Sequence, residues 1–346
     1  MYDYSIIGGG LAGTTLANRL ILQGAKVMVF DCPTQNRSSS VAAGIFNPIT
    51  GKRMALTWQA TEMFGELHSY YTKMEHTLGE TFFYPMPFYK IFESVFDQNE
   101  WLTKLQVVGL EHFMKNEVQN LNPKKVANSF GAMQILKAGR LNSRLYLESM
   151  HRWLRDKKAF TEHLLDYTKI KLSNDWVSCD GIKSHAIIFC DGSQARANPY
   201  FNYLPHKPVH GELLEVEIPD FYKDRIVNKG VFIVPLPTDR YLVGATYNWD
   251  LEEAILTENG QLELETKLQE IVGLNYTIVG HYAGIRPSTK DRRPYIGSHP
   301  KFKNVFNFGG FGSKGVSLIP YLSKVFMNYL LNDADLPSEV DICRVK

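Results

Sequence analysis

Gly8-Gly9-Gly10-Leu11-Ala12-Gly13 follows the apolar run Tyr4-Ser5-Ile6-Ile7 at the beginning of the chain. The apolar run predicts a short buried strand, and the pattern over Leu11 to Gln23 predicts a helix that ends at Gly24. Lys26 to Phe30 (KVMVF) predicts a second strand. Together these segments predict a βαβ unit with parallel strands and a glycine-rich turn between the first strand and the helix.

The glycines of this turn match the spacing G-x-G-x-x-G, which is typical of a dinucleotide site. Gly8 permits the tight turn, Gly10 lets a pyrophosphate approach the backbone, and Gly13 lets the helix pack closely on the strand. The backbone of Leu11 and Ala12 then lies at the positive end of the helix. Asp31 follows the second strand, where a carboxylate accepts hydrogen bonds from a ribose. A tight turn without a ligand, with Asp31 as an ordinary strand-end residue, is the alternative interpretation.

Composition limits the class of protein. The chain has 346 residues, a net charge of +2, 44% hydrophobic residues and four cysteines. This length favours two domains, and the charge gives no electrostatic case for a dedicated nucleic-acid binder. The cysteine spacing predicts neither a disulfide scaffold nor a metal site. We find no targeting pattern, and Val316 to Leu331 is too polar to span a membrane, so we expect a cytoplasmic protein.

Further along the chain, Ala186 to Cys190 predicts another buried strand, followed by Asp191-Gly192. This arrangement is typical of the second nucleotide-proximal turn of FAD proteins, although an ordinary buried strand end has the same pattern. Residues 32–53 are expected to form a loop. The remaining predicted helices and strands comprise helices over Ala55–His76, Asn142–Lys157 and Glu258–Val272, and strands over Glu212–Ile218, Gly230–Val234 and Tyr241–Ala245.

Two late motifs add family information: Ala283 to Gly297 (AGIRPSTKDRRPYIG) and Gly309 to Val316 (GGFGSKGV). With the N-terminal turn, they resemble the D-amino-acid oxidase superfamily of FAD-dependent oxidoreductases, which includes glycine oxidase and sarcosine oxidase. The FAD domain of the bifunctional tRNA wobble-uridine modification protein is similar too. Further matching segments occur in family order: Ser39–Pro48, Pro208–Glu212, Val234-Pro235 and Tyr241–Thr246.

The resemblance implies an α/β fold with a Rossmann-like FAD-binding domain of the glutathione-reductase type and a substrate domain built on an antiparallel sheet. It implies a discontinuous FAD-binding domain of residues 1–76, 140–205 and 280–346. Residues 77–139 and 206–279 would form the substrate domain.

The resemblance also implies the site residues. Arg286 would pair with the substrate carboxylate, with a structural salt bridge or packing beside the flavin as the alternatives. Lys314 would lie close to the flavin edge, where it could assist oxygen reduction or be an ordinary solvated lysine. The cofactor-binding residues implied in total are Gly8, Gly10, Leu11, Ala12, Gly13, Asp31, Ser39, Ser40, Ala43, Gly44, Ile45, Leu165, Cys190, Asp191, Gly192, Gly284, Arg286, Gly310, Gly312, Ser313, Lys314, Gly315 and Val316.

The implied reaction is oxidation of the C–N bond of an amine or amino acid that carries a carboxylate, with hydride transfer to flavin N5, hydrolysis of the imine, and oxygen or another electron acceptor. Two departures from the family pattern matter. Phe232 stands where amino-acid oxidases usually have a tyrosine, which puts glycine or another small amino acid in doubt. No cysteine lies near Gly284, so we expect non-covalent FAD.

Two other functions stay open. The first is FAD-dependent removal of a carboxymethyl group from a tRNA wobble-uridine amine, with Lys52, Arg53, Lys290, Arg292 and Arg293 contacting phosphates. The near-neutral charge disfavours tRNA against a small amine. The second is a flavin dehydrogenase, or a flavoprotein without turnover. The sequence leaves open which amine is oxidised, its stereochemistry, the electron acceptor and the oligomeric state.

Overall fold

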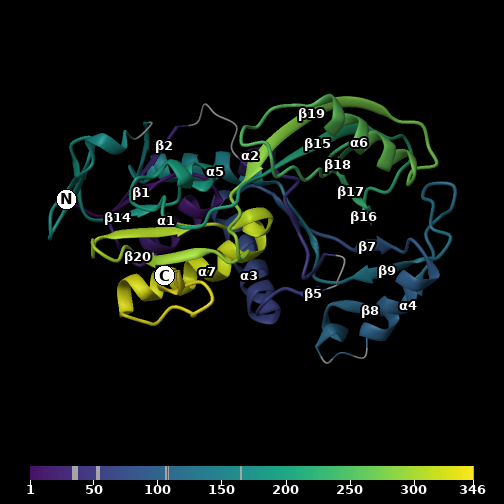
Figure 1. Cartoon of the computed structure of the whole chain (residues 1–346), viewed down its shortest axis with the longest axis horizontal. Coiled ribbons are helices and arrows are strands. Elements are labelled where there is room, and N and C mark those ends of the chain that lie inside the picture. Colours follow the sequence, from purple (N-terminus) through teal and green to yellow (C-terminus); the bar gives the residue numbers. More distant parts are fainter. Residues whose placement is uncertain (33–37, 52–54, 106, 108, 164–165, 346) are drawn as a thin grey trace.

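Two eight-stranded sheets occupy separate halves of the molecule in the computed structural model (Figure 1). The structure describes every residue except 33–37, 52–54, 106, 108, 164–165 and 346. Among the described residues, no helix is long and apolar enough to cross a membrane. The arrangement of the strands agrees with the predicted fold class, an α/β half beside a half built on a mainly antiparallel sheet.

The first sheet contains the predicted βαβ unit. Its strands run in the order β11 (Phe160–Glu162), β2 (Val27–Asp31), β1 (Tyr2–Ile7), β14 (Ile182–Phe189), β13 (Val177–Cys179) and β12 (Lys171–Leu172). β21 (Val305–Gly309) pairs with β14 in parallel, and β20 (Tyr295–Ser298) pairs with β21. The pairs β11–β2, β2–β1 and β1–β14 are also parallel, and the central strand β2 is almost completely buried, as expected in a parallel sheet.

Helices cover this sheet. α1 (Leu11–Leu22) packs against α5 (Ser143–Asp156) and α7 (Gly315–Asn332), and α7 packs against α3 (Ala60–Leu78). α1 begins where the glycine turn predicts it and ends within one residue of the predicted end. The prediction of a helix from Ala55 was wrong at its beginning. Ala55–Leu56 forms β5, paired with β4 (Ile49–Thr50), and Gln59 has a φ of +48°, which does not continue a right-handed helix.

The second sheet lies in the other half. Its strand order is β19 (Thr277–Arg286), β15 (Val209–Glu217), β18 (Arg240–Gly244), β17 (Val231–Pro235), β16 (Ile226–Lys229), β7 (Phe88–Ile91), β9 (Ala132–Ile135) and β8 (Met114–Gln119). Only the pair β16–β7 is parallel among the strand pairs of this sheet that the structure describes. α6 (Glu258–Gln269) packs on β15, β17 and β18, and α4 (Val95–Lys104) lies at the far end (Figure 1).

The expected domain boundary at residue 280 falls inside β19. Residues 280–286 pair with β15, so this part of the segment 280–346 belongs to the second sheet, whereas β20, β21 and α7 belong to the first half. The chain therefore leaves the second sheet at Arg286 and enters the first half directly.

A small three-stranded sheet connects the parts. It consists of β3 (Ile45–Phe46), β10 (Gly139–Leu141) and β6 (Phe83–Pro85). The segment 32–53, expected to be a loop, contains β3, β4 and the short helix α2 (Ser38–Val41). Short 3-10 turns complete the fold at Leu110–His112, Tyr167–Lys169, Gly192–Ala197, Gly312–Lys314 and Ile342–Arg344.

Candidate functional site

Two glycines of the glycine-rich turn, Gly8 and Gly13, have no room for a side chain. A Cβ atom on Gly13 would lie 1.8 Å from the carbonyl oxygen of Gly8, and one on Gly8 would lie 2.5 Å from that of Cys190. Gly8 also has a φ of +103°. Gly10 is the N-cap of α1, and no side chain of the described residues caps this helix end. This helix end is suited to an anionic group such as a pyrophosphate, so the residues fit a dinucleotide.

Asp31 lies beside the same turn. It is the last residue of β2, and a Cβ on Gly9 would lie 2.4 Å from Asp31 Oδ2. His151 of α5 holds this arrangement: its Nε2 lies 2.7 Å from the carbonyl oxygen of Gly9 and 3.8 Å from Asp31 Oδ2. A carbonyl oxygen only accepts, so Nε2 must carry the proton. His151 was not among the predicted site residues, although its place on the buried face of the predicted helix was a usable signal.

The end of β14 closes the turn from the other side. The backbone N–H of Cys190 donates to the carbonyl oxygen of Ile7, which brings the predicted residues Cys190, Asp191 and Gly192 next to β1. Asp191 Oδ2 accepts a 2.6 Å hydrogen bond from Asn198, and Oδ1 is buried with no hydrogen-bond partner among the described residues. Burial raises the pKa of Asp191 to about 7, although Asn198 and Tyr167 act in the opposite direction. Leu165, also predicted, lies outside the described residues.

The short helix α2, with Ser38, Ser39 and Ser40, lies between this turn and the second sheet. Ser39 and Ser40 lie in α2, and a Cβ on Gly10 would lie 3.4 Å from Ser39 Oγ. At the other side of α2, the Ser38 hydroxyl donates to the carbonyl oxygen of Ile285, and Val41 lies beside Gly284. The predicted residues of α2 therefore lie between the dinucleotide turn and β19.

The loop after α2 then reaches the small sheet. Ala43 is buried, and Gly44 has a φ of +71° and accepts a 2.9 Å hydrogen bond from the backbone N–H of Leu141. A Cβ on Gly44 would lie 1.9 Å from the Leu141 carbonyl oxygen, so only glycine fits here. Ile45 follows in β3.

Arg286 ends β19 and is half-buried. Its guanidinium group lies over the ring of Tyr247 at 4.2 Å and donates to the carbonyl oxygen of His210 at 3.1 Å. Burial lowers the pKa of Arg286, and Tyr247 opposes this shift. In the part of the chain that the structure describes, no carboxylate forms an ion pair with Arg286. The alternative of a structural salt bridge thus finds no support there.

Two loops meet beyond Arg286. The N–H of Gly312 donates to the carbonyl oxygen of Pro287 at 3.0 Å, and Gly310 has a φ of +81° beside Thr289. Gly312 and Ser313 form the 3-10 turn with Lys314, and Gly315 and Val316 begin α7. Gly315 approaches Leu11: a Cβ there would lie 4.0 Å from Leu11 Cδ1. The N-termini of α1 and α7 therefore lie close together.

Lys314 stands in a positively charged environment. Burial and the charges of Arg293 and Arg292 lower the pKa of its ammonium group. The guanidinium of Arg293 lies 5.5 Å from the ring centre of Trp58. Among the described residues, no carboxylate pairs with the side chain of Lys314, Arg292 or Arg293. Lys52 and Arg53, named with them as phosphate contacts, lie outside the described residues.

Arg140 is a further cation that the sequence analysis missed. It lies in β10, only 7% exposed, with its guanidinium 5.6 Å from the ring centre of Tyr84. Burial lowers the pKa of Arg140, and within the described part of the chain its buried Nε atom has no hydrogen-bond partner. A lone arginine in a short strand carries no periodic signal, so sequence reasoning could not single it out.

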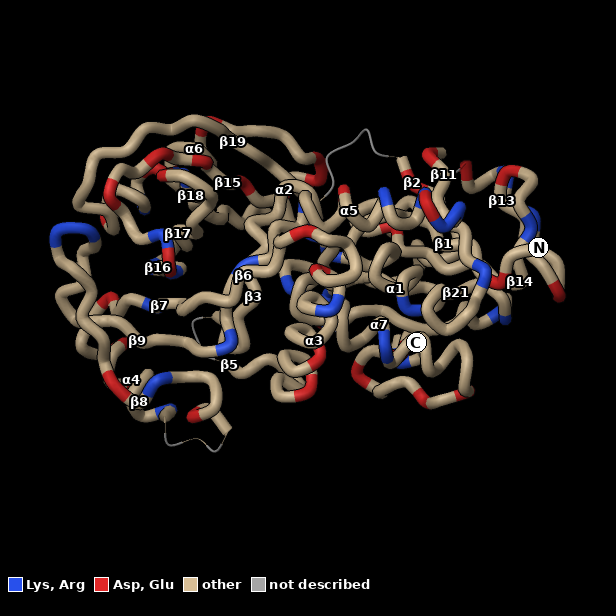
Figure 2. Tube along the Cα trace, turned by 180° about the vertical axis from the view of Figure 1, so that it is seen from behind, with Lys and Arg blue, Asp and Glu red and all other residues tan. Residues whose placement is uncertain are grey.

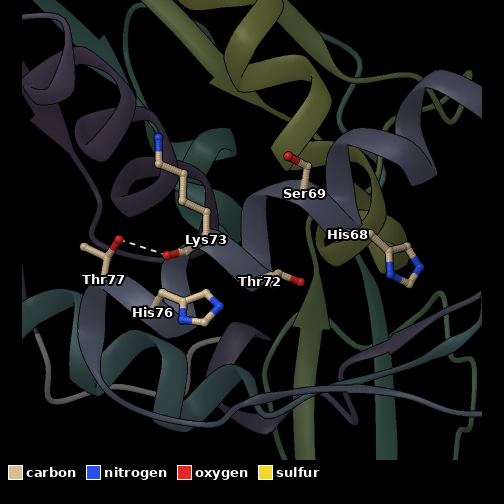
Figure 3. A pocket seen from close by; sticks show the side chains of 6 residues that line it. All are labelled: His68, Ser69, Thr72, Lys73, His76 and Thr77. Carbon is tan, nitrogen blue, oxygen red and sulfur yellow. Dashed lines mark hydrogen bonds between the residues drawn. The ribbon is translucent and has the colours of Figure 1, made fainter.

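An open hollow on α3 and the surface charges lie outside the group of predicted site residues, and the described residues offer no metal site. This hollow, shown in Figure 3, contains none of the predicted site residues; it is lined by His68, Ser69, Thr72, Lys73, His76 and Thr77. No group of His, Cys, Asp and Glu in the described part of the chain is placed to hold a metal ion. Figure 2 shows Lys and Arg interspersed with Asp and Glu along both halves of the trace.

Comparison with known proteins agrees with this geometry. Residues 3–328 match the profile of the DAO family, described as "FAD dependent oxidoreductase". Glycine oxidase of Bacillus subtilis strain 168 is 23% identical over 96% of this chain and 93% of its own. The structure of iminodiacetate oxidase from Chelativorans sp. BNC1 superimposes with a TM-score of 0.81 at 20% identity, covering 97% of this chain and 98% of its own.

A bifunctional tRNA-modifying protein is also similar. The tRNA 5-methylaminomethyl-2-thiouridine biosynthesis bifunctional protein of Legionella pneumophila strain Philadelphia 1 is 22% identical over 91% of this chain. The match covers 52% of that protein, so this chain corresponds to about half of its length.

Proposed function

The chain belongs to the DAO family of FAD-dependent oxidoreductases, and from this premise we propose that it oxidises the C–N bond of an amine or amino acid that carries a carboxylate. The observation that carries the proposal is Arg286, a half-buried cation at the end of β19 with no carboxylate partner among the described residues. A guanidinium binds a carboxylate through two parallel hydrogen bonds, so Arg286 would fix one end of the substrate.

The residues that would hold FAD lie on the first sheet. The N-terminus of α1 would bind the pyrophosphate, and Asp31 the ribose. The N-terminus of α7, with Gly312 to Val316, would present backbone N–H groups to the flavin end. When bound, FAD supplies the capacity to accept two electrons from the substrate. We propose that this binding is non-covalent, since no cysteine lies near Gly284 in the sequence.

The protein's own residues would orient the substrate and stabilise charge. Arg286 binds the carboxylate, and the ring of Tyr247 limits where the guanidinium can move. Phe232, in β17 opposite Gly244, adds apolar surface instead of a hydroxyl. Such a site favours a larger or less polar amine over glycine, because a polar group facing Phe232 would lack a partner.

The test is anaerobic reduction of the FAD-loaded protein with a panel of glycine, sarcosine, iminodiacetate and larger amino acids. We expect at least one carboxylated amine to bleach the flavin absorbance, and air to restore it with release of peroxide. Reduction without peroxide would indicate a dehydrogenase. If no amine bleaches the flavin, the proposal is wrong. Arg286→Ala should raise the apparent KM with FAD still bound, whereas the exposed Arg144→Ala should leave KM unchanged.

A tRNA amine is the second candidate substrate. It is favoured by the similarity to the bifunctional tRNA protein and by Lys290 and Arg292, which are exposed and have no ion-pair partner among the described residues. Incubation with tRNA that carries a carboxymethylaminomethyl group should then remove the mass of a carboxymethyl group from the nucleoside. An unchanged nucleoside would reject this candidate.

Acid precipitation tests the proposal that FAD is bound non-covalently. If it is, all the yellow colour of the flavin should stay in the supernatant.

A further inference from the structure

Arg140 and its neighbour Leu141 lie on opposite faces of the small sheet, because successive residues of a strand alternate between its two faces. In β10, Arg140 is directly opposite Ile45 of β3 and Tyr84 of β6, and directly opposed residues of antiparallel strands share a face. Leu141, its neighbour in β10, points to the other face together with Phe46 and Phe83, and all of these are buried in the main core. Arg140 is therefore placed on the side of Ile45, a residue of the predicted flavin-contacting loop.

The charge of Arg140 is not neutralised within the described part of the chain. The residue is only 7% exposed, and no carboxylate there forms an ion pair with it. Among the described residues the Nε atom of Arg140 has no hydrogen-bond partner, and the guanidinium carbon lies 5.6 Å from the centre of the Tyr84 ring. A buried, unpaired cation is costly, and stacking on a ring offsets only about 0.5–2 kcal/mol. An anion that binds beside it would remove this cost.

Arg140 and Arg286 flank the same short loop. At one end of the loop, Val41 lies beside Gly284, two residues before Arg286 in β19. At the other end, Gly44 accepts the hydrogen bond from Leu141, and Ile45 lies opposite Arg140. The chain from Val41 to Ile45 spans at most about 14 Å, because a residue advances the chain by no more than about 3.6 Å. Both unpaired arginines are thus near the loop that would contact the flavin.

We propose that Arg140 is a second anion-binding residue of the site and that the preferred substrate is an amino diacid, with one carboxylate on Arg286 and the other on Arg140. This inference rests on the proposed function, because the amine between the two carboxylates is the group that would be oxidised. A guanidinium suits the task, since its fork of donors matches a carboxylate and its charge persists at every physiological pH.

The test compares a diacid with its monoamide, succinate with succinamate, in calorimetric titrations of the FAD-loaded protein. The two probes have nearly the same shape and differ by one charge. We expect succinate to bind at least tenfold more tightly than succinamate in the wild type. Arg140→Leu should reduce this ratio to near one, and Arg140→Lys should restore part of it. The control is Arg144→Leu, an exposed arginine in α5 that pairs with Glu148 and should leave the ratio as in the wild type.

Equal binding of the two probes by the wild type overturns the proposal, and this arm needs no variant. A ratio that persists in a folded Arg140→Leu protein also overturns it, because Arg140 then has only a structural role against Tyr84. The proposed function is tested separately by flavin reduction with amino monoacids and diacids. If an Arg140-dependent preference for diacids exists but no amine reduces the flavin, the anion site stands and the oxidase assignment fails. If amines reduce the flavin but the protein shows no such preference for diacids, the oxidase assignment stands and the anion site at Arg140 is rejected.

Discussion

The guanidinium carbon of Arg286 lies 4.2 Å from the centre of the Tyr247 ring, so the cation that we assign to the substrate carboxylate is stacked before any substrate binds. Tyr247 is 60% exposed and follows β18 in the loop that begins at Ala245. Backbone hydrogen bonds between Thr246 and Glu212 and between Asn248 and His210 fix this loop to β15. The Tyr247 ring therefore restricts the orientation of the Arg286 guanidinium group.

Removing the ring should weaken binding of the carboxylate. A cation–π contact at an exposed position contributes about 0.5–1 kcal/mol, which corresponds to about two- to fivefold in affinity. We predict this loss for Tyr247→Leu, measured as the dissociation constant of a non-oxidisable carboxylate. Tyr247→Phe keeps the ring and should retain wild-type affinity unless the hydroxyl itself contacts the ligand. Wild-type affinity in Tyr247→Leu would show that the stack has no part in binding.

Gly13 offers a test of the dinucleotide turn. A methyl group there would lie 1.8 Å from the Gly8 carbonyl oxygen, a backbone atom that cannot move without displacing β1 or α1. We predict that Gly13→Ala loses most of its FAD, measured as the flavin absorbance per protein after purification.

Gly65 in α3 is the matched control. A Cβ there would meet nothing within 4 Å. Gly65→Ala should keep its FAD and gain stability, since alanine favours a helix by about 1 kcal/mol over glycine. A Gly13→Ala protein with a full complement of FAD would contradict the assignment of this turn to the pyrophosphate.

The sequence predicts the turn well because its signals are local. The glycines, the flanking apolar runs and Asp31 lie within one βαβ unit, and each restricts the backbone independently. The end of β14 was predictable for the same reason. The resemblance to a family then assigned α2 and the loop after β19 to the site, although neither segment has a clear hydrophobic period of its own.

Features that depend on contacts between distant segments were not predictable. The surroundings of Arg140 come from β3, β6 and β10, which are far apart in the chain. His151 reaches Gly9 across the packing of α5 on α1. The wrong beginning of α3 has a similar cause, since pairing of Ala55–Leu56 with β4 overrides the helical pattern there. Tertiary contacts decide such cases, and hydrophobic periodicity does not record them.

The raised pKa of Asp191 predicts that the free energy of unfolding depends on pH. This pKa rises from 3.8 to about 7 on folding, so between about pH 4 and pH 7 the folded state holds a proton that the unfolded chain has released. The contribution of Asp191 to stability is therefore fully present below about pH 4 and is lost as the pH rises through 7. Asp191→Asn removes this dependence. At pH 8 we expect the variant apoprotein to be the more stable one, by at most about 4 kcal/mol.

The measurement is the Tm of the apoprotein between pH 5 and pH 8. The difference in Tm between Asp191→Asn and wild type should increase with pH across this range. Asp335→Asn, at an exposed position before the C-terminal turn, is the control and should follow the wild-type profile. A difference that stays constant with pH would show that Asp191 does not take up a proton on folding.

Lys314 is expected to act after the substrate has been oxidised. Its ammonium group is half-buried, is next to Arg293 and has no carboxylate partner among the described residues, so its field is poorly screened. A fixed positive charge stabilises the negative charge that develops on oxygen as it is reduced. We predict that Lys314→Met slows reoxidation of the reduced protein by oxygen about tenfold, equal to about 1.4 kcal/mol. Stopped-flow absorbance after photochemical reduction measures this rate without any substrate.

Two comparisons separate the charge of Lys314 from its shape and from the general field. Lys314→Arg keeps the charge and should retain most of the reoxidation rate. Lys290→Met removes an exposed cation from the neighbouring loop and should have little effect, because solvent screens an exposed charge. The rate of anaerobic reduction by substrate should change less than twofold in Lys314→Met, since Arg286 and not Lys314 binds the carboxylate. Equal reoxidation rates in Lys314→Met and wild type would leave Lys314 as a solvated lysine at the start of α7.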